Sequence, residues 1–158
     1  MEQIWAPWRM QLIEGPKKDG CIFCDLPGEG EDRKNLVLHR GKQAFVIMNA
    51  FPYTAGHLMV APFRHVARLA DLTPGEKAEL MDLVAKCETV LSDAMRPEGF
   101  NVGFNLGRAA GAGVDKHLHC HIVPRWVGDT NFMPVLGETR VINEALDKTY
   151  EKLKEYFK

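Results

Sequence analysis

Alternating and continuous apolar runs predict several short strands. Residues 36–39 and 43–49 are strand-like, and residues 40–42, Arg-Gly-Lys, separate them with the spacing of a hairpin that has a glycine turn. Residues 58–62 form a third apolar run. Over residues 100–104, large apolar side chains alternate with asparagine and glycine, which predicts a half-buried fourth strand. The pattern indicates a sheet built from short strands.

Two segments instead carry helical periodicity. Thr73-Pro74-Gly75-Glu76 supplies a cap residue, a proline at the first helical position and a glutamate at the third, so we expect a helix to begin there. Apolar positions at helical spacing continue this helix as far as Ala94. Residues 27–33 are polar and glycine-rich and predict a loop. A final helix is predicted over residues 143–157, with four apolar side chains on one face: Leu146, Tyr150, Leu153 and Phe157.

Length and composition favour one domain. With 158 residues and 46% apolar content, the chain can bury one sizeable core. Lys and Arg number 20 against 21 for Asp and Glu, so an anionic substrate must be recognised locally. Residues 1–10 lack the apolar run of a signal peptide, and no later stretch is apolar enough to span a bilayer. We therefore expect a cytoplasmic protein without a nucleic-acid or membrane partner.

Three histidines alternate with apolar residues in His117-Leu118-His119-Cys120-His121. On a strand, this pattern places three imidazoles on one face and the intervening apolar side chains on the core, with Pro124 closing the run. Successive imidazoles would lie about 7 Å apart, which is roughly the width of a phosphate with its ligands. Because the unperturbed pKa of imidazole is about 6.5, a neutral ring can attack phosphorus at cellular pH.

A loop rich in glycine and alanine precedes the triad. Its backbone amides can approach phosphate oxygens closely. The candidate phosphate contacts are therefore Asn105, Gly111, Ala112 and Gly113. Two alternatives stay open: the histidines could face solvent without a function, or they could form a zinc site with Asp115 as its acidic partner. Because Asp115 would lie at the entrance of the strand, the nucleophile interpretation is favoured.

Two of the four cysteines form the motif Cys21-Ile22-Phe23-Cys24. This spacing suits one half of a tetrahedral zinc site, and since the sequence has no second such pair, the other ligands would be histidines. The alternative is a thioredoxin-like redox pair. It is disfavoured because the following sequence does not predict the helix that such a site needs. Cys87 and Cys120 are expected in the core.

Together these motifs resemble the histidine-triad (HIT) superfamily, in which His-apolar-His-apolar-His is followed by two apolar residues, as in residues 117–123. Residues 49–60 resemble its first nucleotide-binding segment. Residues 124–126 and 128–132 resemble the diadenosine polyphosphate branch of the family. Residues 5–10, Trp-Ala-Pro-Trp-Arg-Met, resemble the start of bacterial members related to the fragile-histidine-triad hydrolases and to diadenosine tetraphosphate phosphorylases. The resemblance extends from about Cys21 to the C-terminus.

The resemblance implies an α+β HIT-like fold with an antiparallel sheet of about five strands, a long helix and a C-terminal helix. Residues 1–158 would form a single HIT domain, with an N-terminal extension over residues 1–20 and a C-terminal helical segment over residues 135–158. A homodimer is also implied. Three tryptophans are candidates for packing near the dimer interface or the base, or in the core: Trp5, Trp8 and Trp126.

The resemblance further implies an enzyme that cleaves dinucleoside polyphosphates, such as diadenosine tri- or tetraphosphate, through a covalent nucleotidyl-histidine. His119 would attack the α-phosphorus and His121 would contact a phosphate oxygen, with His117 as the remaining member of the catalytic triad. Asn49 would bind the ribose, and His57 would lie beside the phosphates. Hydrolysis is the first expectation. Phosphorolysis, nucleoside phosphoramidase activity and a non-catalytic nucleotide-binding module are the alternatives.

Zinc-bearing relatives imply a closed, structural zinc site and no organic cofactor. The implied ligands are Cys21, Cys24, His65 and His117. The chain departs from well-known members at Ala112-Gly113, where they carry glutamine followed by serine or threonine. The usual donor to the leaving group is therefore absent, and the small side chains favour access for inorganic phosphate as the second nucleophile.

Overall fold

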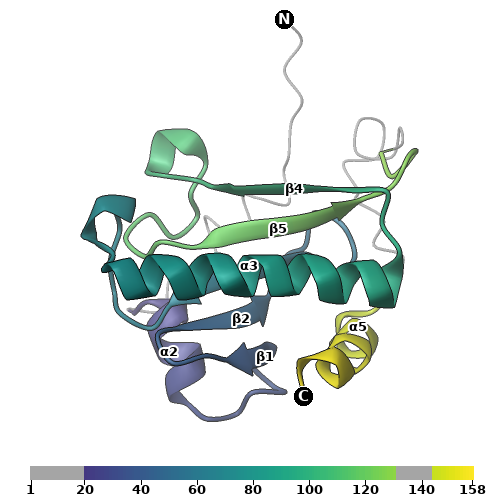
Figure 1. Ribbon diagram of the computed structural model, residues 1–158, viewed down its shortest axis with the longest axis horizontal. Coiled ribbons are helices and arrows are strands. Elements are labelled where there is room, and N and C mark those ends of the chain that lie inside the picture. The colour runs from purple at the N-terminus through teal and green to yellow at the C-terminus, as the bar shows by residue number, and fades with distance from the viewer. Residues whose placement is uncertain (1–19, 131–143) are drawn as a thin grey trace, which may run out of the picture.

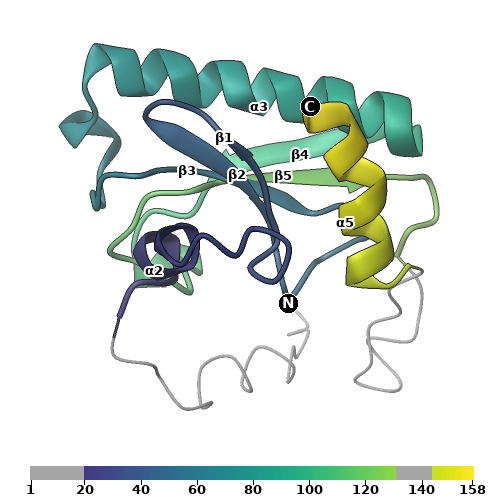
Figure 2. The same cartoon turned by 90° about the horizontal axis from the view of Figure 1, so that it is seen from below.

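The computed structural model describes residues 20–130 and 144–158. Within these residues, five antiparallel strands form one sheet in the order β1-β2-β3-β5-β4 (Figures 1 and 2). Sequential hairpins make the first half of this sheet, and β5 lies between β3 and β4. The strands are β1 (Val37–Arg40), β2 (Ala44–Met48), β3 (Leu58–Pro62), β4 (Gly99–Phe104) and β5 (Cys120–Arg125).

A long helix, α3 (Pro74–Met95), covers one face of the sheet, and the short helix α2 (Ile22–Gly28) lies on the other (Figure 2). The start of α3 is a capping box in which Thr73 accepts from the Glu76 amide and Glu76 accepts from the Thr73 amide. The C-terminal helix α5 (Leu146–Lys154) continues into a 3₁₀ turn, Glu155–Phe157, and packs beside α3 and β1.

Both faces of the central strands are buried. Every residue of β2 and β3 is buried, because α3 and α5 cover one face while α2 and its neighbours cover the other. The larger core cluster joins α3, α5 and the sheet. The smaller one lies beneath α2 and consists of Phe23, Val37, Phe45, Ile47, Met59 and Ala61. The sheet is therefore a rigid platform for the loops at its ends.

The expected α+β architecture, with a five-stranded antiparallel sheet, a long helix and a C-terminal helix, is confirmed, and four local expectations are corrected. Residues 27–33 do not form a loop throughout, because α2 continues to Gly28. Strand β4 is more exposed than half-buried, since it lies at the edge of the sheet and Val102 is 48% exposed. The last helix begins at Leu146 within the described residues.

The fourth correction concerns β5, which begins only at Cys120 and contains Pro124 instead of ending before it. Pro124 is tolerated there because pairing with β3 ends at Ile122, so no hydrogen bond of that ladder is lost.

Two parts of the earlier expectations fall outside the described residues. These are most of the N-terminal extension, including Trp5 and Trp8, and the first part of the C-terminal segment, residues 135–143. Among the helices that the structure does describe, none is both long and apolar enough to cross a membrane.

Candidate active site

His119 precedes the first residue of β5 and is 5% exposed. Its Nδ1 lies 2.8 Å from the carbonyl oxygen of His117. Because a carbonyl only accepts, Nδ1 carries the proton of the neutral ring, and Nε2 keeps its lone pair. Burial lowers the pKa of His119, and the hydrogen bond to the carbonyl partly offsets this effect. His119 is therefore a neutral imidazole with the lone pair that a nucleophile needs.

A second pair of imidazoles lies beside it. His57, at the start of β3, is 1% exposed, and its Nε2 lies 2.9 Å from Nδ1 of His121 in β5. The Tyr53 amide donates to Nδ1 of His57 at 3.1 Å. Nδ1 of a neutral His57 must then be the acceptor, so its proton is on Nε2 and is donated to His121. The proton of a neutral His121 is consequently on Nε2.

The loop between β2 and β3 holds this pair in place. The Tyr53 ring lies 4.5 Å from the His57 ring and 6.0 Å from the His121 ring, measured between centroids. Asn49 accepts from the Phe51 amide at 2.9 Å, and its Nδ2 lies 3.4 Å from Nδ1 of His57. The structure thus brings two of the predicted substrate-binding residues, Asn49 and His57, to the triad.

The triad is more compact than an ideal strand predicts. The ring centroids of His119 and His121 lie 4.8 Å apart, and the rings are inclined at 71°. The expected separation of about 7 Å assumed parallel side chains on one strand. It is wrong because His119 lies before β5 and its ring turns toward His121. As predicted, the intervening side chains Leu118 and Cys120 are buried in the main core.

A cavity of ≈ 880 Å³ opens beside His121. Tyr53 and Asn105 line it, which places the predicted residue Asn105 near the triad. Arg125 and Asp129 also line it, and Arg125 donates to both oxygens of Asp129 at 2.6 and 2.8 Å. These hydrogen bonds hold the pKa of Asp129 well below its usual range.

The glycine loop is partly closed on itself. Residues Arg108–Ala110 form a 3₁₀ turn between Gly107 and Gly111, both of which have positive φ. The amides of Gly111 and Ala112 donate to carbonyl oxygens within the loop, at 2.9 and 3.4 Å. Two amides of the predicted phosphate cradle are thus already engaged in this conformation, whereas Gly113 is exposed.

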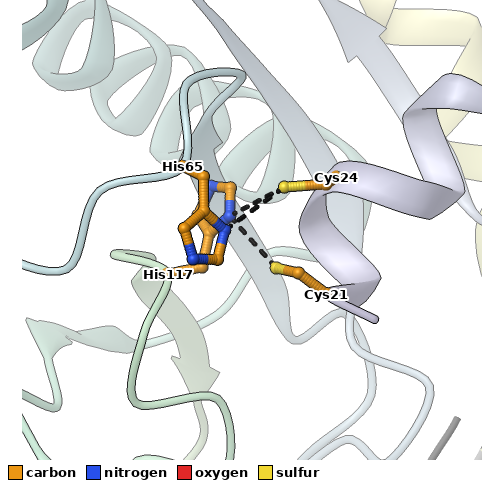
Figure 3. Close-up of side chains that lie close together, drawn as sticks. All are labelled: Cys21, Cys24, His65 and His117. Carbon is orange, nitrogen blue, oxygen red and sulfur yellow. Dashed lines mark hydrogen bonds between the residues drawn. The ribbon is translucent and has the colours of Figure 1, made fainter. Parts of the chain in front are cut away.

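The four predicted zinc ligands converge at the start of α2 (Figure 3). Their ligand atoms all lie within 4.8 Å of one another. Sγ of Cys21 lies 3.2 Å from Nδ1 of His117, and Sγ of Cys24 lies 3.4 Å from Nδ1 of His65. A zinc tetrahedron with Zn–S bonds of about 2.3 Å and Zn–N bonds of about 2.0 Å has edges of roughly 3.5 Å. The donor set and its spacing therefore fit zinc.

His117 is turned toward this cluster. Its Nε2 lies 2.8 Å from the Pro62 carbonyl, so Nε2 carries the proton and Nδ1 faces both cysteines. A carbonyl partner of this kind orients metal-binding histidines. Burial, together with the neighbouring Cys21, raises the pKa of Cys24 to about 11, and a bound cation would reverse this by stabilising the thiolate. Both nitrogens of His117 thus have partners, the Pro62 carbonyl on one side and the two cysteines on the other.

The prediction that the cysteine pair does not open a helix is wrong, because α2 begins at Ile22. What separates the pair from a redox motif is instead the proximity of His65 and His117. Sequence reasoning also missed Phe23, whose ring lies 4.6 Å from that of His119. It did not assign Tyr53 either. In both cases the available signal was an aromatic residue inside a motif. Phe23 lies between the two cysteines, and Tyr53 lies between Asn49 and His57.

Comparison with known proteins identifies the family of this chain. The family model described as the HIT domain matches residues 29–127. The AP-4-A phosphorylase of Mycobacterium tuberculosis is 43% identical over 158 residues, which cover 94% of this chain and 80% of that protein. The chain therefore belongs to the HIT family, as its resemblance implied.

Solved structures show the same fold. The NitFhit protein of Caenorhabditis elegans is 29% identical with a TM-score of 0.63, and the match covers 76% of this chain and 27% of that longer chain. A Zn-bound histidine triad family protein from Mycobacterium smegmatis is 23% identical with a TM-score of 0.69, covering 87% and 93% of the two chains. At that identity the second likeness bears on the fold alone.

Proposed function

We propose that this chain is an enzyme that cleaves dinucleoside polyphosphates, such as diadenosine tetraphosphate, by phosphorolysis. The observation that carries the proposal is the buried His119, whose Nδ1 proton is fixed by a carbonyl and whose Nε2 keeps its lone pair. The relative named AP-4-A phosphorylase supports phosphorolysis over the hydrolysis that was expected first.

The reaction proceeds in two transfers. Nε2 of His119 attacks the α-phosphorus, an N–P bond forms, and the bond to the bridging oxygen breaks, so that ATP leaves from diadenosine tetraphosphate. An oxygen of inorganic phosphate then attacks the same phosphorus, the N–P bond breaks, and ADP is released. His121 donates its Nε2 proton to a phosphate oxygen or to the leaving oxygen, which stabilises the charge of the transition state. His121 thereby serves as the donor to the leaving group, a role for which Ala112-Gly113 offers no side chain.

The remaining predicted residues hold the substrate. Asn49 binds the ribose, and His57 keeps His121 in the donor tautomer. The glycine loop contacts the phosphates with Asn105 and with Gly111, Ala112 and Gly113, after the internal hydrogen bonds of two of these residues have opened. Small side chains there leave room for the incoming phosphate.

Product analysis tests phosphorolysis. With diadenosine tetraphosphate and ³²P-labelled phosphate, the proposal expects equal amounts of ATP and labelled ADP. Formation of AMP and ATP without dependence on phosphate identifies a hydrolase, and preferential turnover of adenosine-amine conjugates identifies a phosphoramidase. Binding without turnover in any of these assays identifies a nucleotide-binding module.

We infer that Cys21, Cys24, His65 and His117 hold a structural zinc ion. The four converging ligand atoms and the carbonyl partner of His117 support this assignment. When bound, the metal supplies charge that stabilises two thiolates, and it links the start of α2 to the segments that carry His65 and His117. Elemental analysis should find one zinc per chain, which Cys24→Ser reduces and the core substitution Cys87→Ala does not. Absence of stoichiometric zinc from wild type contradicts the assignment.

We also propose that the chain forms a homodimer. The edge position of β4 and the exposed Val102 support this, because an exposed edge strand is a ready pairing surface. Analytical ultracentrifugation should give twice the monomer mass for wild type. Val102→Lys should weaken association, whereas Met81→Lys, a substitution of an exposed residue of α3, should not. A monomeric wild type contradicts the proposal.

A further inference from the structure

Phe23 lies between the two cysteines of the cluster and faces the nucleophile. It is 1% exposed, and its ring centroid lies 4.6 Å from that of His119, with the two ring planes inclined at 30°. It also lies 5.4 Å from the His117 ring. A single aromatic side chain therefore contacts both a zinc ligand and the residue that attacks phosphorus.

The cysteines on either side fix where this ring lies. Helix α2 has seven residues and includes Pro27, so it is too short to be stable by its own hydrogen bonds. Its first turn is tied down by Cys21, which approaches His117, and by Cys24, which approaches His65. Phe23 lies within that turn. Metal bound to the four ligands would thus hold the Phe23 ring in place.

Two contacts define the orientation of the His119 ring. The hydrogen bond from Nδ1 to the His117 carbonyl fixes one edge of the ring, and Phe23 packs against one face. Rotation about the side-chain bonds of His119 would break both contacts. Because Nε2 must point at phosphorus within a narrow range of angles, loss of either contact costs rate.

We propose that Phe23 is a positioning residue that holds His119 in its attacking orientation, and that metal binding acts on the nucleophile through Phe23. The inference rests on the proposed nucleophilic role of His119 and on the proposed zinc site. It adds that the metal cluster affects the chemical step through one identified side chain, and not only the stability of the fold.

Phe23→Leu tests the proposal, because leucine retains apolar packing but removes the flat face. Phe45→Leu is the matched control. Phe45 is fully buried in the same apolar cluster, but it stacks on Phe63, at 5.1 Å, and not on a histidine. Formation of the nucleotidyl-enzyme in a single turnover should slow about 10²-fold in Phe23→Leu, with KM changed by less than about threefold. Phe45→Leu should keep the wild-type rate.

A second readout is independent of activity. The ring current of Phe23, whose centroid lies 4.6 Å from that of His119, should shift the His119 ring protons in the NMR spectrum, and both Phe23→Leu and removal of zinc by chelation should abolish this shift. Chelation should also slow wild type more than it slows Phe23→Leu. Equal rates for Phe23→Leu and Phe45→Leu, or a His119 shift that survives chelation, would overturn the proposal. Failure of wild type to form any nucleotidyl-enzyme instead contradicts the proposed function.

Discussion

Nε2 of His57 lies 2.9 Å from Nδ1 of His121, and the direction of this hydrogen bond is set by a backbone amide. The Tyr53 N–H donates to Nδ1 of His57, which leaves the proton of His57 on Nε2. His57 therefore donates to His121, so a backbone amide of the loop determines the tautomer of a triad histidine. His119 and His121 consequently have opposite tautomers: the first has its proton on Nδ1, and the second has it on Nε2. One ring can attack phosphorus while its neighbour donates.

This arrangement predicts the ¹⁵N spectrum of the histidines. At a pH where both rings are neutral, long-range ¹H–¹⁵N correlations should identify His119 as the Nδ1–H tautomer and His121 as the Nε2–H tautomer. His57→Gln should leave the tautomer of His119 unchanged. It should give His121 a mixture of both tautomers, because the glutamine side chain can present either its oxygen or its NH₂ group to Nδ1 of His121. Two triad rings with the same tautomer in wild type would contradict the division of roles.

Gly56→Ala should disturb the site, because Gly56 directly precedes His57 in the chain. Gly56 has a φ of +79°, and an added Cβ would lie 2.7 Å from Sδ of Met95. The substitution should lower the free energy of unfolding by about 1–3 kcal/mol and reduce kcat by displacing His57. Gly99→Ala is the control, because a Cβ at Gly99 meets nothing within 4 Å. Equal stability of the two variants in urea denaturation would refute the steric argument.

The start of α3 predicts a pH dependence of stability. Hydrogen bonds from Arg64 and from the Thr73 amide lower the pKa of Glu76 from 4.5 to about 2. Between these values the unfolded chain binds more protons, so this contribution to stability is complete above pH 4.5 and is lost as the pH falls toward 2. In Glu76→Gln the free energy of unfolding should fall less steeply than in wild type as the pH decreases from 4.5 toward 2. In Glu88→Gln, at an exposed position of α3, it should fall as steeply as in wild type.

Loss of the cap itself has a separate effect. Thr73→Ala removes the oxygen that accepts from the Glu76 amide, and it should lower the free energy of unfolding by about 1 kcal/mol at neutral pH. Urea titrations measure the change. An unaltered midpoint would mean that the hydrogen bond contributes nothing to the stability of α3.

Periodicity and local motifs were sufficient to predict most of the fold. The third strand was predicted at its exact bounds, and the capping box placed the start of α3, because both signals are local. The length of β5 was not predictable from alternation alone, since pairing with β3 and β4 decides where the strand begins. The four-ligand cluster came from the resemblance. No pattern along the chain brings His65 close to Cys24.

The contacts that orient the site were also beyond sequence reasoning. The Phe23 ring lies against that of His119 and the Tyr53 ring against that of His121, each from a distant segment of the chain, and such contacts have no spacing rule. Likewise, alternation on a strand predicted three equivalent imidazoles. In the structure, backbone carbonyls and an amide give each ring a different environment.

The most direct test of the central claim is capture of the covalent intermediate. Enzyme mixed with diadenosine tetraphosphate without phosphate should acquire one adenylyl group per active site, and mass spectrometry of the alkali-stable peptides should place it on His119. Addition of phosphate should release it as ADP. His119→Ala should acquire none, whereas His39→Ala, a substitution at a histidine whose ring lies 5.7 Å from that of Phe157, should acquire as much as wild type. Phosphate-dependent turnover by His119→Ala, or an adenylyl group on another residue, would contradict the account.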